Sequence, residues 1–173
     1  MKSLKTLVSL SALAVCMGAA SMANAVSISP DGAFSTSSGT IVVKSPSSFG
    51  AAVTCGITFK GNVTSGVATI NDAKLTGGGL CDLPVLKNIP TPGWVLTATS
   101  LSGGTVTNVG YTITKPLIPL TDCGPDTINV TWNNSTHALT ANNQTLTGHT
   151  SGTSPNCVVQ SLTVTAPSLT IVP

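Results

Sequence analysis

Apolar and polar residues alternate over short stretches along most of the chain. In the clearest stretch, VTCGITF at 53–59, Val53, Cys55, Ile57 and Phe59 fall on one face of an extended strand. Similar stretches rich in Val, Ile and Thr predict strands at 40–44, 66–75, 94–100, 105–114, 127–133, 137–147 and 157–171, the last broken by Pro167. Beyond residue 25 no apolar stripe has helical spacing, so we expect almost no helix.

The spacing of these strands predicts the class of fold. Strands that recur at roughly ten-residue intervals, without crossover helices between them, are typical of antiparallel all-β proteins. We expect an antiparallel β-sandwich or a partly closed β-barrel of about 8–10 short strands, and the pattern does not distinguish the two. We assign residues 40–173 to a single β domain, and residues 26–39 to a loosely ordered N-terminal arm.

The first 25 residues have the features of a secretory signal peptide. Lys2 and Lys5 precede an apolar run, and Ala23-Asn24-Ala25 matches a small-residue cleavage site. The run is diluted by Ser and Gly and is shorter than the roughly 20 residues of a membrane-spanning helix. We therefore expect a secreted protein, exported through the periplasm, that starts at Val26 and does not span a membrane after cleavage.

Four cysteines follow the signal: Cys55, Cys81, Cys123 and Cys157. An even number of cysteines in an exported chain predicts two disulfides, for which three pairings exist. The sequence favours the sequential pairing, Cys55 with Cys81 and Cys123 with Cys157, without excluding the others. A zinc site would need Cys-x-x-Cys pairs or a neighbouring His, and neither occurs, so we expect no metal and no cofactor.

Charge is scarce in this chain. Charged residues make up 7% of it, against about 25% in ordinary soluble domains. After residue 25 five Lys balance five Asp, and Arg and Glu are absent. Without clustered Lys or Arg there is no surface for phosphate backbones, so nucleic acid is not an expected partner. A neutral, hydroxyl-rich surface repels its neighbours weakly, which suits adsorption and self-association.

The stretch CDLPVLKNIPTPGW, residues 81–94, combines large apolar side chains with three prolines. Proline cannot donate to a central β ladder, so the stretch predicts a stiff connector rather than a core strand. Its apolar side chains either cap one end of the core or face outward. If they face outward, they form an apolar contact surface made of Leu83, Val85, Leu86, Ile89 and Trp94.

The residues that could carry catalysis are few and scattered. His137 and His149 lie beside turn-like polar sequence without an evident partner, and no Gly-x-Ser-x-Gly motif occurs. Asp122 and Asp126 could form a pair of acidic groups, but Asp before a strand is more often a turn residue. We expect no enzymatic activity.

Four blocks of sequence stand out: TCGITFKGNVTSG, GGGLCD, the Pro92-Gly93-Trp94 opening of a Thr-rich strand, and DCGPDTINVTWNNST. Together they resemble the PraB-like family of bacterial activators of alkane oxidation. The resemblance extends over nearly the whole chain. It implies a secreted protein that helps cells to use long-chain alkanes, in a biosurfactant-like role rather than as the oxidising enzyme. It implies no catalytic residues.

Composition and resemblance together give two functional hypotheses. In the first, the protein is a secreted accessory factor whose partner is the hydrocarbon phase, because a charge-poor surface loses little hydration at an oil boundary. In the second, it is a structural subunit or adhesin of the cell surface or extracellular matrix, with the arm or an exposed edge strand pairing with a neighbour.

Overall fold

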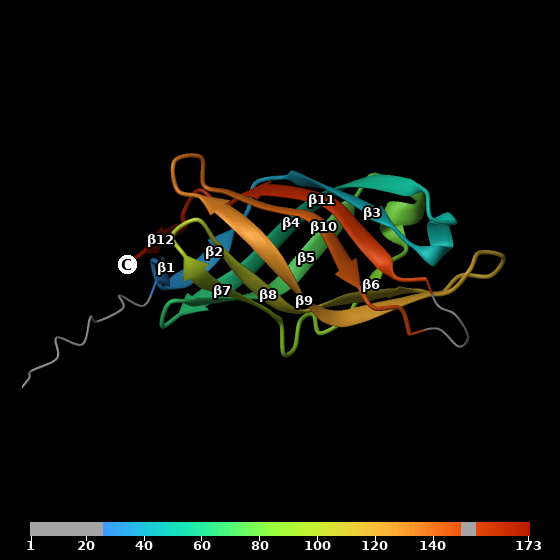
Figure 1. Cartoon of the computed structure of the whole chain (residues 1–173), viewed down its shortest axis with the longest axis horizontal. Helices are drawn as coiled ribbons and strands as arrows, with labels where there is room; N and C mark the ends of the chain where they lie inside the picture. The colour runs from blue at the N-terminus through green and yellow to red at the C-terminus, as the bar shows by residue number, and fades with distance from the viewer. Residues whose placement is uncertain (1–25, 150–154) are drawn as a thin grey trace, which may run out of the picture.

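The computed structural model describes residues 26–149 and 155–173, and these form a closed antiparallel β-barrel (Figure 1). The predicted signal peptide at 1–25 lies outside the described residues. Eight strands close the barrel in the order β4-β3-β11-β10-β9-β8-β7-β5, and β5 pairs back with β4. Their bounds are β3 Gly39–Lys44, β4 Ala52–Thr64, β5 Val67–Thr76, β7 Trp94–Ser100, β8 Gly103–Ile113, β9 Thr121–Asn133, β10 Ala138–Leu146 and β11 Cys157–Thr165.

The remaining elements are short. Strand β2 (Gly32–Ser35) extends the sheet along β4, and β6 (Val85–Leu86) pairs with β8. Strands β1 (Ser27–Ser29) and β12 (Thr170–Val172) form a separate two-stranded sheet. Two single 3-10 turns, η1 (Pro46–Ser48) and η2 (Gly79–Asp82), are the only helical segments in the described part of the chain.

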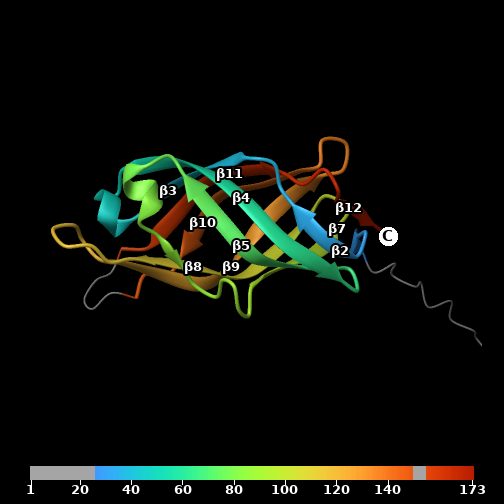
Figure 2. The same ribbon diagram turned by 180° about the vertical axis from the view of Figure 1, so that it is seen from behind.

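Alternation along each strand places the apolar side chains inside the barrel. In β4 the side chains of Cys55, Ile57, Phe59 and Val63 are buried, whereas the intervening Lys60 is exposed on the outer face. The β4–β5 hairpin, which crosses the front of the barrel in Figure 2, turns through Ser65-Gly66. Both residues have positive φ, 51° and 79°, as a two-residue turn that matches the strand twist requires.

The two ends of the barrel differ. At one end the β1–β12 sheet folds over the opening. Its own Ile28 and Ile171 are buried, and so is Leu169, which directly precedes β12. Asn134, in the β9–β10 turn, fixes this cap by bonding both the backbone N–H and the carbonyl of Ile171 at 2.9 Å. The opposite end carries η1, η2, β6 and the β8–β9 loop (Figure 1).

The N-terminal segment corrects one expectation. Residues 26–39, predicted as a loosely ordered arm, contain β1 and β2, and both are paired along their full lengths. Ser27 lies opposite Val172, and Phe34 lies opposite Gly61 with its ring buried. The sequence signal for these strands is weak because each has three or four residues, and their partners lie far away in the chain.

Candidate functional site: an apolar cavity and its rim

The barrel encloses an apolar cavity of about 70 Å³. Each of the eight barrel strands contributes at least one apolar side chain to its wall, as Ile57 does from β4 and Ile128 from β9. The hydroxyls of Ser45, Ser47 and Tyr111 are the only side-chain oxygen atoms among the lining residues. A cavity with such a wall stays dry or takes up an apolar guest, because water needs several polar partners.

The barrel wall is interrupted beside this cavity. Strand β7 pairs with β5 only as far as Ile70, opposite Trp94, so the second half of β5 has no ladder on that side. The two residues of β6 occupy part of the space but pair with β8 alone. Half-buried lining residues lie along this interruption: Leu75 on β5, Leu80 on η2 and Leu86 on β6.

Tyr111 is the polar exception in the wall. It is 7% exposed, and its hydroxyl has no hydrogen-bond partner among the described residues. Burial raises the pKa of Tyr111 from 10.0 to about 12. The nearby Ser45 side chain lowers the pKa of Tyr111 and offsets part of that rise. The Ser45 and Tyr111 hydroxyl oxygens do not meet the geometry of a hydrogen bond, so the phenol has no partner among the described residues.

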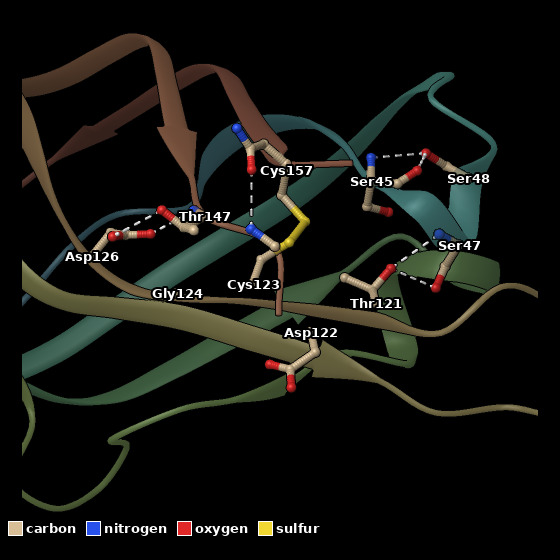
Figure 3. The surroundings of a disulfide bond; sticks show 12 residues. Ser45, Ser47, Ser48, Thr121, Asp122, Cys123, Gly124, Asp126, Thr147 and Cys157 are labelled. Atoms are coloured by element: carbon tan, nitrogen blue, oxygen red, sulfur yellow. Dashed lines mark hydrogen bonds between the residues drawn. A yellow bond between two sulfur atoms is a disulfide. The ribbon is translucent and has the colours of Figure 1, made fainter. Parts of the chain in front are cut away.

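Ser47 joins two loops at this end of the barrel. Its hydroxyl donates to the Pro119 carbonyl at 2.7 Å and lies 2.7 Å from the hydroxyl of Thr121 (Figure 3). Its backbone N–H also donates to Thr121, at 3.0 Å. Both side chains are buried. This polar network joins η1 to the β8–β9 loop. Exposed apolar side chains lie directly after η1, at Phe49, and within the loop, at Leu117 and Leu120.

Four exposed apolar residues surround this end of the barrel, and we call them the rim: Phe49, Val85, Leu117 and Leu120. Their exposed fractions are 78%, 68%, 101% and 47%. Phe49 follows η1, Val85 lies in β6, and the two leucines lie in the β8–β9 loop. One other large apolar residue of the described chain is exposed, Leu101, in the β7–β8 turn at the capped end.

Two rim residues have unfavourable backbone conformations. Phe49 has φ of 53° and Leu117 has φ of 72°, in the left-handed region that bulky residues rarely adopt. This conformation costs about 1–2 kcal/mol for a residue other than glycine. Because both side chains are exposed to solvent, packing within the chain does not offset this conformational energy.

Both disulfides lie near the rim. They pair Cys55 with Cys81 and Cys123 with Cys157, which is the sequential pairing that the sequence favours. Cys55–Cys81 attaches η2 to β4, and Cys123–Cys157 joins β9 to β11 beside the end of β10, the strand between them (Figure 3). The bridges therefore fix η2 and the adjoining ends of β9 and β11 at the end of the barrel that carries the rim, which we call the open end.

The structure divides the apolar contact surface predicted at residues 83–94. Val85 points outward, whereas Leu83, Leu86 and Ile89 are partly buried against the core. Trp94 is buried, lines the cavity and donates from its indole N–H to the Lys87 carbonyl at 2.8 Å. Trp94 is thus part of the inner wall and not of an outer surface. Before Trp94, the first residue of β7, this stretch has β structure only at the two residues of β6, in keeping with prolines that cannot donate to a ladder.

The other sequence candidates do not converge. The side chain of Asp122 pairs with Lys87, while that of Asp126 accepts from the Thr147 backbone N–H at 2.6 Å. The His137 ring contacts the Leu169 carbonyl at the capped end, far from the loop that holds His149. No group of three or more His, Cys, Asp or Glu side chains able to hold a metal occurs within residues 26–149 and 155–173.

Sequence reasoning missed Phe49, Leu117 and Leu120. The segment KPLIPL at 115–120 has a readable signal, because it places aliphatic residues between prolines in a turn between two strands. Phe49 has a weaker one, an aromatic residue beside glycine after a Ser-rich turn. Exposure of each depends on how the loop folds, which periodicity does not specify.

A comparison with known protein families identifies the chain. Residues 1–173, its whole length, match the family described as alkane oxidation protein activator PraA/PraB-like. The protein belongs to this family. No curated protein and no solved structure matches the chain.

Family membership indicates a role connected with alkane oxidation. The PraA/PraB-like family is described by its activating role. None of the helical segments in the described residues is long and apolar enough to cross a membrane. The described residues offer three distinctive features: an apolar cavity, an unpartnered phenol inside it, and an apolar rim around one end.

Proposed function

We propose that the protein is a secreted, non-enzymatic accessory factor that promotes alkane oxidation by contacting the hydrocarbon phase through its rim. The observation that carries this proposal is the distribution of exposed apolar side chains. Four of the five large ones in the described chain surround the end that holds the cavity. A molecule with one apolar end and polar barrel walls orients at an oil–water boundary.

The energetics are sufficient for adsorption. Full transfer of a large apolar side chain from water is worth about 1.5–3 kcal/mol. Partial transfer of four rim side chains gives about 4–8 kcal/mol, and a gain of about 4 kcal/mol already corresponds to a dissociation constant near 1 mM. Few charges would lose hydration on contact, because Lys and Asp are scarce throughout the chain.

The strained rim residues support a role outside the folding of the chain. Selection against unfavourable conformations at Phe49 and Leu117 would replace them by glycine or asparagine if they served only as turn residues. Two disulfides support the secreted location, since such bonds persist in oxidising compartments. Purification from culture medium should yield a chain that starts at Val26.

Variants of exposed residues at the two ends test this role. A variant with Phe49→Ser, Val85→Ser, Leu117→Ser and Leu120→Ser should lower hexadecane–water tension far less than the wild type. Leu101→Ser, which removes the exposed aliphatic side chain at the capped end, is the matched control and should behave like the wild type.

Circular dichroism and thermal unfolding would verify that both variants keep the barrel. All five substituted side chains are exposed, so we expect changes in stability within about 0.5 kcal/mol for each. Equal surface activity of the wild type and the folded rim variant would contradict the proposal.

The structural-subunit or adhesin hypothesis receives less support from the topology. Every barrel strand has a neighbour on each side along at least part of its length, so strand addition would have to use short edges such as β2, β6 or the second half of β5. An apolar rim could still join two copies of the chain. Size-exclusion chromatography of the wild type and the rim variant would reveal such self-association as a change in oligomeric state.

A further inference from the structure

The cavity contains a hydrogen-bond donor without an acceptor. Tyr111 lies on β8 opposite Leu86 of β6, and both residues line the cavity. Its hydroxyl is the one buried side-chain polar atom without a partner in the described residues. Folded proteins rarely retain such groups, and an exception is a sign of a missing partner.

Two further hydroxyls line the wall, those of Ser45 and Ser47. The Ser47 hydroxyl is bonded to Pro119 and Thr121, as described above, whereas the Ser45 hydroxyl lies near the phenol of Tyr111. The ammonium group of Lys87 donates to Asp122 and to the Gly124 carbonyl, and Lys87 is not among the residues that line the cavity. A guest in the cavity would therefore meet the Tyr111 hydroxyl, with the Ser45 hydroxyl near it, and no charged side chain.

These features define the chemistry of a guest. The phenol of Tyr111 is neutral at physiological pH and can donate a hydrogen bond to an oxygen atom. A carboxylate would be buried without a counter-ion, which is strongly unfavourable. A plain alkane would fill the cavity but leave the phenol unpaired.

We propose that the cavity takes a neutral alkyl chain with one terminal oxygen, a primary alcohol, whose oxygen accepts a hydrogen bond from Tyr111. This inference rests on the proposed function, which brings the protein into contact with alkyl compounds. A primary alcohol is also the compound formed when a terminal methyl group is hydroxylated, so the site would distinguish an oxidised chain from an unreacted one.

The cavity volume limits the length of chain that it encloses. One water-sized position requires roughly 10–15 Å³ of such volume. The 70 Å³ cavity therefore accommodates about five to seven heavy atoms. A six-carbon alcohol, with its oxygen included, lies at the upper end of this range, and a longer chain would extend through the interruption between β5 and β6.

The test compares an alcohol with an alkane of equal length in two variants. Binding of 1-hexanol and of n-hexane would be followed by the change in tryptophan fluorescence, since Trp94 lines the cavity and the other tryptophan, Trp132, does not. Tyr111→Phe removes the donor and should weaken 1-hexanol binding by about three- to tenfold, while n-hexane binding stays equal or becomes tighter.

Ile113→Val is the matched control, since Ile113 lies two residues away on β8 and lines the same cavity. It removes a methyl group without changing polarity, so it should weaken both compounds by the same factor. Hexanoate should bind more weakly than 1-hexanol to the wild type. An equal effect of Tyr111→Phe on alcohol and alkane, or no effect on either, would overturn the inference.

A spectroscopic measurement distinguishes recognition from a packing role. Tyr111 is the single tyrosine of the chain, so tyrosinate absorbance reports on it alone. Bound 1-hexanol and bound n-hexane should give different tyrosinate fractions at about pH 11, because the alcohol hydroxyl forms a hydrogen bond with the Tyr111 oxygen whereas the alkane only excludes water from it. Identical fractions with both compounds would contradict the proposed contact.

The two proposals fail in different experiments. If the rim variant keeps full surface activity but Tyr111→Phe selectively weakens 1-hexanol, the hydrocarbon-contact function is overturned and the alcohol site stands. If the rim variant loses surface activity but 1-hexanol does not bind the folded wild type, the alcohol site is overturned and the contact function stands.

Discussion

Single residues at the open end of the barrel depart from what folding alone would favour. Phe49 and Leu117 expose apolar side chains from a strained backbone, and Tyr111 buries a hydroxyl without a partner. Such departures cluster at functional sites, because the rest of the structure must be stable enough to maintain them. In this protein they occur around one cavity.

The raised pKa of Tyr111 predicts how the free energy of unfolding depends on pH. Its pKa is about 12 in the folded protein and 10.0 when unperturbed, so the folded state keeps the proton to higher pH. The resulting contribution to the free energy of unfolding is fully present below pH 10 and is lost as the pH rises through 12. A shift of two units corresponds to about 3 kcal/mol.

Chemical unfolding of the wild type and Tyr111→Phe at a series of pH values measures this contribution. Relative to the Phe variant, the free energy of unfolding of the wild type should fall by about 2–3 kcal/mol between pH 10 and 12. Titration of lysines cancels in the difference. Parallel curves for the two proteins would show that the phenol is not desolvated in the folded state.

At the scale of elements, the two disulfides close loops of similar size but hold different parts of the site. Their sequence separations are 26 and 34 residues, so each should stabilise the protein by about 3–4 kcal/mol. Cys55–Cys81 fixes η2, whose Leu80 lines the cavity, and Cys55 itself lines it, whereas neither Cys123 nor Cys157 is a lining residue.

Paired Cys→Ala variants separate these roles. Cys55→Ala with Cys81→Ala, and Cys123→Ala with Cys157→Ala, should both lower the free energy of unfolding in urea by about 3–4 kcal/mol. Binding of n-hexane under conditions where both variants are folded should weaken more in the Cys55/Cys81 variant. Equal weakening in both would mean that η2 does not shape the cavity.

At the scale of the whole molecule, the barrel is directional and nearly uncharged. One end is capped by β1 and β12, the other presents the rim, and five Lys balance five Asp after residue 25. Contact with hydrocarbon should therefore depend on apolar area and not on charge. The pair Lys60–Asp72, at 3.7 Å on the outer wall, is largely exposed and contributes little.

Salt dependence tests this expectation. Adsorption to hexadecane should stay constant or rise slightly as salt increases from about 0.01 to 1 M, a range over which the screening length falls from about 30 to 3 Å. The rim variant provides the baseline at each salt concentration. A steep fall with salt would indicate a charged partner in place of the hydrocarbon.

Most strands could be predicted from sequence because alternation is a local property. The strand predicted at 94–100 matches β7, and the break predicted at Pro167 separates β11 from β12. The choice between sandwich and barrel was not local. It depends on β5 pairing with both β4 and β7, and on β3 pairing with β11 more than 100 residues later.

The site was less predictable than the fold. Leu86 and Val85 are adjacent and equally apolar, yet β6 turns one toward the cavity and the other toward solvent. A two-residue strand carries too little periodic signal to show which side chain faces inward. The same limit applies to Phe49 and Leu117, whose exposure follows from loop conformation.

The sequence by itself determined the all-β class, most strand positions, the low charge and the cysteines available for pairing, because each depends on residue type and short-range spacing. Only the tertiary structure decided that the strands close into a barrel, that one end is capped, and that a cavity holds the unpartnered Tyr111 hydroxyl. These features depend on contacts between residues far apart in the chain, and local alternation carries no information about them.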